Sequence, residues 1–386
     1  MPVTIVLPWY GPDTAGGAEA HARQLVQALQ QAGVEVEVWT TTARDARTPL
    51  APYYPVGWST VDGIPVRRFP ATCGHLPPLV RRAPARFGLD KCSIHEWHLL
   101  ESLASSDELL ATLEAERLSR RWVFFLYAFP TTFFGAQLAG DHAALIPCLH
   151  DEPYARYMTT RHLLCSVPLI MANSRAEVQL IQQISGRPTT RCPIVGEGID
   201  LTAQGDGLAF RRAHGLAGPL LFFMGRRDHT KNFPLLLAYL ERRWAEHGPQ
   251  PQLLVAGAGQ LHVPPALRPW IYDLGFVSEA EKYSAYAAAD IFCMPSVLES
   301  YSLVVMEAWL HGTPALVHAD CAVTVDHCRQ ANAGLWFRSY REFDACLDRL
   351  LDSRVGPRLG QNGRDFVLRE CRWEDVAHRF IHALNP

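Results

Sequence analysis

Two glutamates interrupt an otherwise apolar segment of the chain. Residues 295–314 read PSVLESYSLVVMEAWLHGTP, with Glu299 and Glu307 eight positions apart. Residues 302–311 are mostly Leu, Val, Met, Ala and Trp, which predicts a helix that is apolar on all sides and therefore buried. Burying an unpaired carboxylate is costly, so a glutamate in such a helix needs a partner. That partner is either a structural arginine or a ligand.

Two basic residues follow the apolar run LLFFMG. Arg226 and Lys231 lie directly after it, in RRDHTKN. The run predicts a parallel strand, and open α/β sheets bind ligands at the carboxyl ends of their strands. Two cations there suit a diphosphate, and a solvated basic loop is the alternative. The predicted helix directs the backbone N–H groups of Tyr301, Ser302 and Leu303 toward the same edge, which favours phosphate binding.

The amino-terminal half contains two weaker features. Gly16 and Gly17 precede a predicted helix and allow close approach of a ligand, although a plain turn explains two glycines equally well. His150 and Asp151 follow the apolar run ALIPCL. A single histidine near a strand end is more often structural than catalytic, whereas a His–Asp pair facing an interdomain cleft is a better candidate.

The sequence lacks the usual metal-binding patterns. No two aspartates are separated by a single residue, and the ten cysteines include no C-x-x-C pair. The cluster DCAVTVDHC, residues 320–328, mixes hard and soft ligands and matches no common metal geometry. We therefore expect no metal, so that Arg226 and Lys231 neutralise a bound diphosphate unaided. The scattered cysteines predict free thiols in a reducing cytoplasm.

Two series of alternating strands and helices must position these residues. The first opens with strand VTIVLP, helix AEAHARQLVQALQQAG and strand VEVEVWTT, and the second starts near Pro219 with PLLFFMG. Such series predict two doubly wound α/β domains. We expect the first to span residues 1–195 and the second residues 196–371, with a hinge in CPIVGEGID. A carboxyl-terminal helix at about residues 372–386 is expected to pack back on the first domain.

Composition indicates a soluble protein. The 386 residues carry a net charge of -3 and are 48% hydrophobic, so nothing suggests nucleic-acid binding. The longest uncharged stretch, residues 122–140, is interrupted by Pro130, which favours a buried strand and helix over a membrane span. We place the protein in the cytoplasm. Residues 44–120 hold Pro and Arg clusters such as LPPLVRRAPARFG, which form a mobile loop, a membrane-surface element or a solvated face.

Together these features resemble the family 4 retaining glycosyltransferases of GT-B architecture, in which two Rossmann-like domains face across a cleft. The matching segments are GGAEAH, DGIPVRRFP, HD at His150, ANSRAE, GEGID, GRRDHTKN, the E-x7-E pair, EAWLHGTPALV and NGRDFV followed by CRWEDV. They span almost the whole chain, although residues 44–120 match only at DGIPVRRFP. The carboxyl-terminal segments are the most specific.

The resemblance implies a role for each charged residue. Glu307 matches the glutamate that accepts the ribose hydroxyls of a nucleotide, and Glu299 the one beside the transferred sugar. Arg226 and Lys231 match the pair that binds the diphosphate, and His150 the histidine near the reacting sugar.

The resemblance extends to uncharged segments and includes two departures. The loop of Gly16 and Gly17 matches one that approaches the donor phosphates and the acceptor, and Phe276 and Val277 match a segment that borders the base. Glu197 replaces an asparagine common in the hinge motif, which bears on acceptor geometry. Ser302, three positions after the first glutamate, stands where glycine is common, which is expected to tighten the space near the sugar slightly.

The implied reaction is transfer of a hexose from a nucleoside diphosphate sugar to a sugar or lipid-linked sugar, with retention and without a metal. Bacterial polysaccharide or glycolipid synthesis, in the cytoplasm or at the inner face of the membrane, is the expected setting. A nucleotide-sugar epimerase and a non-catalytic sugar-nucleotide binding protein are alternatives. A dehydrogenase is poorly supported, because GAG at residues 257–259 lacks the third glycine of the dinucleotide fingerprint. Peripheral membrane contact would involve Arg81, Arg82 and Arg86 beside Leu76, Leu79, Val80 and Phe87.

Overall fold

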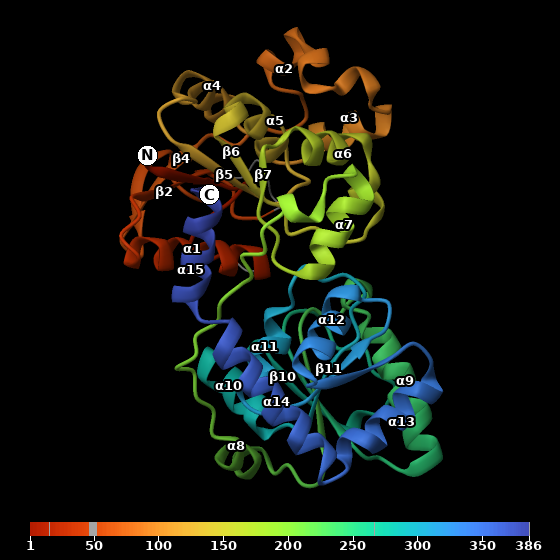
Figure 1. The fold of residues 1–386 in the computed structure, drawn as a ribbon. Coiled ribbons are helices and arrows are strands. Elements are labelled where there is room, and N and C mark those ends of the chain that lie inside the picture. The colour runs from red at the N-terminus through yellow and green to blue at the C-terminus, as the bar shows by residue number, and fades with distance from the viewer. Residues whose placement is uncertain (15, 46–51, 266, 386) are drawn as a thin grey trace. The chain divides into compact units, whose positions relative to one another are not determined.

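The chain forms two compact units. The computed structural model describes residues 1–14, 16–45, 52–265 and 267–385. Unit 1 comprises Met1–Gly198 together with the residues from Trp373 onward, and unit 2 comprises Ile199–Arg372 (Figure 1). The first boundary therefore follows Gly198, where residue 195 was expected.

Unit 1 is built on a seven-stranded sheet in the order β3-β4-β2-β1-β5-β6-β7. Only the edge strand β3 is antiparallel to its neighbour. The strands are β1 (Val3–Val6), β2 (Val36–Thr41), β3 (Gly57–Val61), β4 (Ile64–Phe69), β5 (Arg121–Phe125), β6 (Ala143–Ile146) and β7 (Leu169–Ile170). Chain order reverses between β1 and β5, so unit 1 is doubly wound and offers a ligand site at the carboxyl ends of these two strands.

Helices cover the faces of this sheet. They are α1 (Gly17–Gln31), α2 (Pro78–Arg82), α3 (Ile94–Ser102), α4 (Asp107–Glu116), α5 (Pro130–Ala139), α6 (Met158–Ser166), α7 (Arg175–Ser185) and α15 (Trp373–Leu384). The first helix, α1, lies beside the last, α15 (Figure 1). The centroids of the His21 ring on α1 and the Trp373 indole on α15 are 6.0 Å apart. The uncharged stretch at residues 122–140 forms most of β5 and all of α5, both largely buried. None of the helices that the structure describes is long and apolar enough to span a bilayer.

Unit 2 contains a six-stranded sheet in the order β10-β9-β8-β11-β12-β13, with every pairing parallel. The strands are β8 (Leu220–Met224), β9 (Gln252–Ala256), β10 (Ile271–Gly275), β11 (Ile291–Met294), β12 (Ala315–His318) and β13 (Gly334–Phe337). The helices are α8 (Gly207–His214), α9 (Phe233–His247), α10 (Glu279–Ala288), α11 (Leu303–Leu310), α12 (Ala322–Ala331), α13 (Tyr340–Leu351) and α14 (Val355–Glu370). Chain order reverses between β8 and β11. The prediction of two doubly wound α/β domains is therefore confirmed.

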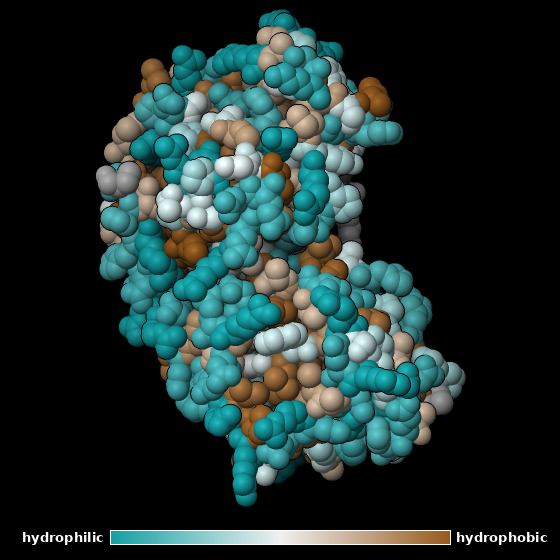
Figure 2. Space-filling model, turned by 45° about the vertical axis from the view of Figure 1, so that its right-hand side comes forward, coloured by the Kyte–Doolittle hydropathy of each residue, from teal (hydrophilic) through white to brown (hydrophobic). Residues whose placement is uncertain are grey.

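The Pro- and Arg-rich segment of unit 1 is folded into the core. Leu76, Val80 and Phe87 are each at most 1% exposed. Nη1 of Arg86 lies 2.9 Å from Oε1 of Glu114 on α4. Three of the four apolar residues of the membrane hypothesis are thus unavailable to a bilayer, and the structure does not support docking through them. The face drawn in Figure 2 is mainly hydrophilic, with apolar residues in small groups.

Candidate active site

Three of the four charged residues predicted in unit 2 lie on the two loops that follow β8 and β11, and the fourth, Glu307, lies on α11. Arg226 and Lys231 follow β8, and Glu299 follows β11. Because chain order reverses between these adjacent strands, their carboxyl ends form the switch point at which doubly wound sheets bind ligands. The Nδ2 group of Asn232 donates to the backbone oxygen of Pro295 at 3.1 Å and joins the two loops.

The loop after β8 is held by an aspartate. Oδ1 of Asp228 accepts the backbone N–H groups of Thr230 at 3.0 Å and Lys231 at 3.2 Å. Burial alone would raise the pKa of Asp228, but a hydrogen bond from the Thr230 hydroxyl, the two backbone bonds and the charge of Arg226 outweigh it and lower the pKa. The half-exposed Arg226 guanidinium donates to Oγ1 of Thr230 at 2.8 Å. The loop therefore presents both cations from a fixed backbone.

The first glutamate of the pair is bound by the predicted phosphate lysine. Nζ of Lys231 lies 2.6 Å from Oε1 of Glu299, whose side chain is 9% exposed. Two of the residues predicted to act on the donor are thus in direct contact. This ion pair supplies the partner that Glu299 requires.

The second glutamate is bound by residues that the sequence analysis did not identify. Oε1 of Glu307 lies 2.8 Å from Nζ of Lys282, and Oε2 accepts the hydroxyl of Tyr286 at 3.0 Å. Both partners come from α10, so the protein partner of Glu307 is a lysine and a tyrosine instead of an arginine. Burial raises the pKa of Glu307, and Lys282 and Tyr286 oppose that increase. The sequence feature that could have indicated this partner is a lysine within the Ala-rich helix EKYSAYAAA.

The helix that carries Glu307 begins in an unusual backbone conformation. Its N-cap, Ser302, has φ 74° and ψ 68°, in the left-handed region that favours glycine. The departure from glycine at Ser302 therefore also places a side chain on a left-handed backbone, a consequence that the sequence analysis did not consider. Tyr301 and Ser302 are buried and Leu303 is half-buried at this helix start.

Phe276 and Val277 follow β10 at the same edge of the sheet. The side chain of Phe276 is 84% exposed, whereas Val277 packs against the core of unit 2. An exposed aromatic ring beside the strand ends is available to a flat ligand. The GAG segment has a packing role, since a Cβ on Gly257 would lie 2.2 Å from the backbone oxygen of Gly225.

In unit 1, the two predicted glycines open α1. A Cβ on Gly16 would lie 2.0 Å from Oε2 of Glu19, whereas one on Gly17 would meet nothing within 4 Å. Oε1 of Glu19 accepts the indole N–H of Trp9 at 2.5 Å. The absence of a side chain at Gly16 therefore leaves room for a carboxylate that ties the loop after β1 to the first turn of the helix.

His150 follows β6, but its acidic neighbour is not the one expected. Nδ1 of His150 lies 3.5 Å from Oε1 of Glu152, whereas Asp151 pairs with Arg156 at 2.6 Å. The predicted His–Asp pair is therefore wrong, because the loop turns Asp151 toward Arg156. The hydroxyl of Tyr127 donates to Glu152 at 2.7 Å.

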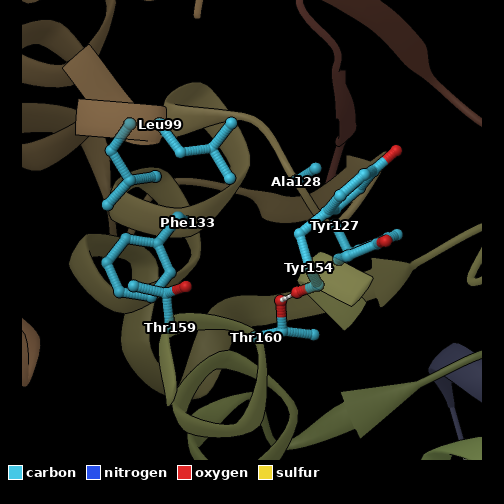
Figure 3. A pocket seen from close by; sticks show the side chains of 8 residues that line it. Leu99, Tyr127, Ala128, Phe133, Tyr154, Thr159 and Thr160 are labelled. Atoms are coloured by element: carbon cyan, nitrogen blue, oxygen red, sulfur yellow. Dashed lines mark hydrogen bonds between the residues drawn. The ribbon is translucent and has the colours of Figure 1, made fainter. Parts of the chain in front are cut away.

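Glu152 has a second tyrosine beside it. The rings of Tyr127 and Tyr154 stack with centroids 5.9 Å apart, at the edge of a small pocket (Figure 3). Burial alone would raise the pKa of Glu152, but hydrogen bonds from His150 and both tyrosines lower it. The carboxylate is therefore held as an anion next to the His150 ring.

A buried glutamate holds the chain just before His150. Glu177, in the first turn of α7, accepts the backbone N–H groups of Leu149 and Asn173, each at 2.6 Å. Burial raises the pKa of Glu177 to about 7. The ANSRAE segment thus has a structural role that the sequence motif alone did not explain.

In the cysteine-rich cluster Asp320 pairs with Arg338 at 2.7 Å, and no group of metal-ligating side chains occurs among the described residues.

Comparison with known proteins shows the family of both units. Residues 16–198 match the glycosyl transferase 4-like domain, and residues 218–353 match the glycosyl transferases group 1 domain. The chain belongs to the family 4 glycosyltransferases. D-inositol 3-phosphate glycosyltransferase of Nocardia farcinica is 27% identical over 95% of this chain and 82% of its own length. The same enzyme of Mycolicibacterium smegmatis is 26% identical over 80% of this chain and 72% of its own.

Solved structures show that this family 4 glycosyltransferase has the GT-B fold. Sucrose-phosphate synthase of Thermosynechococcus elongatus superposes with a TM-score of 0.71 at 18% identity, covering 99% of this chain and 97% of that one. HepE of Anabaena, solved with UDP and glucose, gives a TM-score of 0.67 at 15% identity over 100% and 99% of the two chains. The matched glycosyl transferase domains and the glycosyltransferase relatives, together with this fold, favour a nucleotide-sugar glycosyltransferase over the epimerase and the non-catalytic binding protein.

Proposed function

We propose that this glycosyltransferase moves a hexose from a nucleoside diphosphate sugar to a hydroxyl acceptor with retention of configuration and without a divalent metal. The observation that carries this proposal is the pair of fixed cations, Arg226 and Lys231, at the β8–β11 switch point of unit 2. The HepE structures with UDP and UDP-glucose make UDP the first nucleotide to test. Sugars, phosphorylated polyols and lipid-linked sugars are the acceptor classes to test.

In this reaction the bond between the anomeric carbon and a diphosphate oxygen breaks. The acceptor oxygen bonds to the same face of that carbon, and its proton passes to a departing phosphate oxygen. Negative charge therefore grows on the diphosphate in the transition state, where preorganised cations act most strongly. Arg226 and Lys231 meet that charge, and Glu299, held by Lys231, lies beside the transferred sugar.

The roles of the remaining site residues are part of the same proposal and are those that the family resemblance implies. Glu307 accepts the ribose hydroxyls, the exposed ring of Phe276 with Val277 borders the base, and the α11 start at Tyr301, Ser302 and Leu303 faces the phosphates. In unit 1 the Gly16–Gly17 loop approaches the donor phosphates and the acceptor. His150, oriented by Glu152, contacts the reacting sugar.

The test is a screen of UDP-, GDP- and ADP-sugars for release of the nucleoside diphosphate, with and without acceptors and in excess EDTA. We expect acceptor-dependent release that EDTA leaves intact, and a product whose anomeric configuration, read by NMR, equals that of the donor. An inverted product would refute retention. Loss of activity in EDTA with recovery on added magnesium or manganese would refute metal independence. An altered sugar nucleotide formed without an acceptor would indicate an epimerase.

A further inference from the structure

Lysine is rare in this chain. Only three of its 36 lysine and arginine residues are lysines, namely Lys91, Lys231 and Lys282. Lys91 is exposed in unit 1, whereas each of the other two binds one glutamate of the pair in unit 2. Elsewhere the protein uses arginine even for buried ion pairs, as where Arg243 binds two aspartates of α13. At the two glutamates of the pair, the cation bound to the carboxylate is therefore a lysine, whereas the chain uses arginine almost everywhere else.

Carboxylate geometry gives a reason for this departure. An ionised carboxylate has about four lone-pair positions, and an arginine fork commonly occupies both oxygens at once. Lysine is a point charge that occupies one position. Lys282 takes one position on Oε1 of Glu307 and the Tyr286 hydroxyl takes one on Oε2. About two positions remain, the number that a pair of ribose hydroxyls requires.

We propose that Lys282 is a positioning residue for the nucleotide, which keeps Glu307 ionised and oriented while leaving its remaining lone pairs to the ribose hydroxyls. This inference rests on the proposed function and adds a residue that recognises the donor. Lys282 is itself fixed, because Nζ lies 2.8 Å from Glu279, which also accepts the Tyr283 hydroxyl at 2.9 Å. Its side chain is 11% exposed, so the lysine cannot swing freely into solvent.

The charge around Glu307 comes mainly from α10. Lys282 is the cation in contact with it, and the carboxylate of Glu279 and the hydroxyls of Tyr283 and Tyr286 are the other titratable groups of that helix nearby. At the carboxyl end of α11, Nδ1 of His311 lies 2.8 Å from the backbone oxygen of Glu307, and the His311 ring stacks on Tyr283.

These neighbouring groups decide whether removing Lys282 raises or lowers the pKa of Glu307. Burial lowers the pKa of His311, the charges of Arg364 on α14 and of Lys282 lower it further, and the hydrogen bond to the backbone oxygen of Glu307 opposes them. The imidazole is therefore neutral near pH 7 in the wild-type protein. Removing Lys282 would leave a buried carboxylate beside the negative Glu279, and both effects raise the pKa of Glu307. Glu307 would then become protonated at a higher pH than in the wild-type protein. A protonated carboxyl loses lone pairs to its own proton and binds the ribose less tightly.

The experiment measures UDP and GDP affinity by calorimetry from about pH 5.5 to about pH 9, a window that covers a raised carboxyl pKa. In Lys282→Met we expect affinity to fall by about 10- to 100-fold at pH 7, the value of one charge-assisted hydrogen bond, and to recover toward alkaline pH. Lys282→Arg should keep the wild-type pH profile but bind more weakly at every pH, since its fork occupies the positions the ribose needs. Lys91→Met is the matched control and should behave as wild type.

A Lys282→Met profile parallel to that of the wild type would overturn the proposal, as would full affinity in Lys282→Arg. Because Lys282→Met could fail to fold, a second measurement uses the wild-type enzyme alone. Amine acylation followed by mass spectrometry reports on all three lysines at once, and we expect bound nucleotide to protect Lys231 and Lys282 but not Lys91. Protection of Lys231 alone would refute the role of Lys282 and leave the proposed function intact. A wild-type enzyme that binds no nucleotide would instead refute the proposed function.

Discussion

Replacing Lys231 tests whether catalysis depends on fixed cations. Lys231→Met removes the ammonium group that lies 2.6 Å from Glu299 and keeps most of the side-chain volume. Removing one preorganised electrostatic group from such a site lowers turnover by roughly 10²–10³-fold, or about 2.7–4 kcal/mol. We expect kcat to fall by that factor and the donor KM to change much less, because the interaction strengthens toward the transition state.

The ion pair with Glu299 suggests a competing explanation. If Lys231 served only to neutralise that carboxylate, the variant would be slow because a largely buried charge had lost its partner. The double variant Lys231→Met with Glu299→Gln separates the two explanations through a mutant cycle. We expect it to be about 100-fold slower than Glu299→Gln alone, because the diphosphate still lacks its cation.

The assay is the initial rate at saturating donor and acceptor in excess EDTA, with Lys91→Met as the control for loss of an exposed lysine. Thermal unfolding of each variant shows whether the fold is kept. A double variant as fast as Glu299→Gln alone would refute the reasoning, since Lys231 would then act only through the carboxylate.

Three further predictions concern the donor site of unit 2. Glu307→Gln should weaken nucleotide binding by about 10-fold or more, since each charge-assisted bond to a ribose hydroxyl contributes roughly 1.5–3 kcal/mol, and unchanged calorimetric affinity would contradict it. Ser302→Gly should be about 1 kcal/mol more stable than Ser302→Ala in denaturant unfolding, because φ 74° disfavours a side chain, and equal stabilities would count against backbone strain. Phe276→Ala should leave stability within about 0.5 kcal/mol, because the ring is 84% exposed, yet weaken UDP binding by about 10-fold, and equal affinity would show that the base does not stack there.

The fold was predictable because local patterns decide it. Buried parallel strands read as continuous apolar runs, and LLFFMG and IFCM became β8 and β11 at the positions expected. Arg226 and Lys231 could be assigned to a strand end for the same reason. The burial of Leu76, Val80 and Phe87 could not be predicted, because residues 44–120 show neither a strand nor a helix period to indicate which side chains face inward.

The site was less predictable because its decisive contacts are long-range. Lys282 and Glu307 lie on different helices, and no local pattern indicates which lysine a buried carboxylate will meet. His150 gave the same difficulty on a smaller scale, since the course of an irregular loop decided between Asp151 and Glu152. The left-handed conformation of Ser302 was signalled only by the usual presence of glycine at that position.

Each glutamate of the pair has its own lysine, and the proposed function gives the two ion pairs different roles. The ammonium of Lys231 is shared between Glu299 and the site expected for the diphosphate, so an incoming phosphate competes with a carboxylate for one cation. The ribose hydroxyls are neutral and bring their own protons, so they add to Glu307 without displacing Lys282. Under the proposed function, ionised Glu307 would stay paired with Lys282 whether the site is empty or full, whereas Glu299 would lose part of its partner as the donor binds. In the proposed reaction, a carboxylate partly released at the position expected for the transferred sugar would stabilise the positive charge that develops on the sugar as the diphosphate departs.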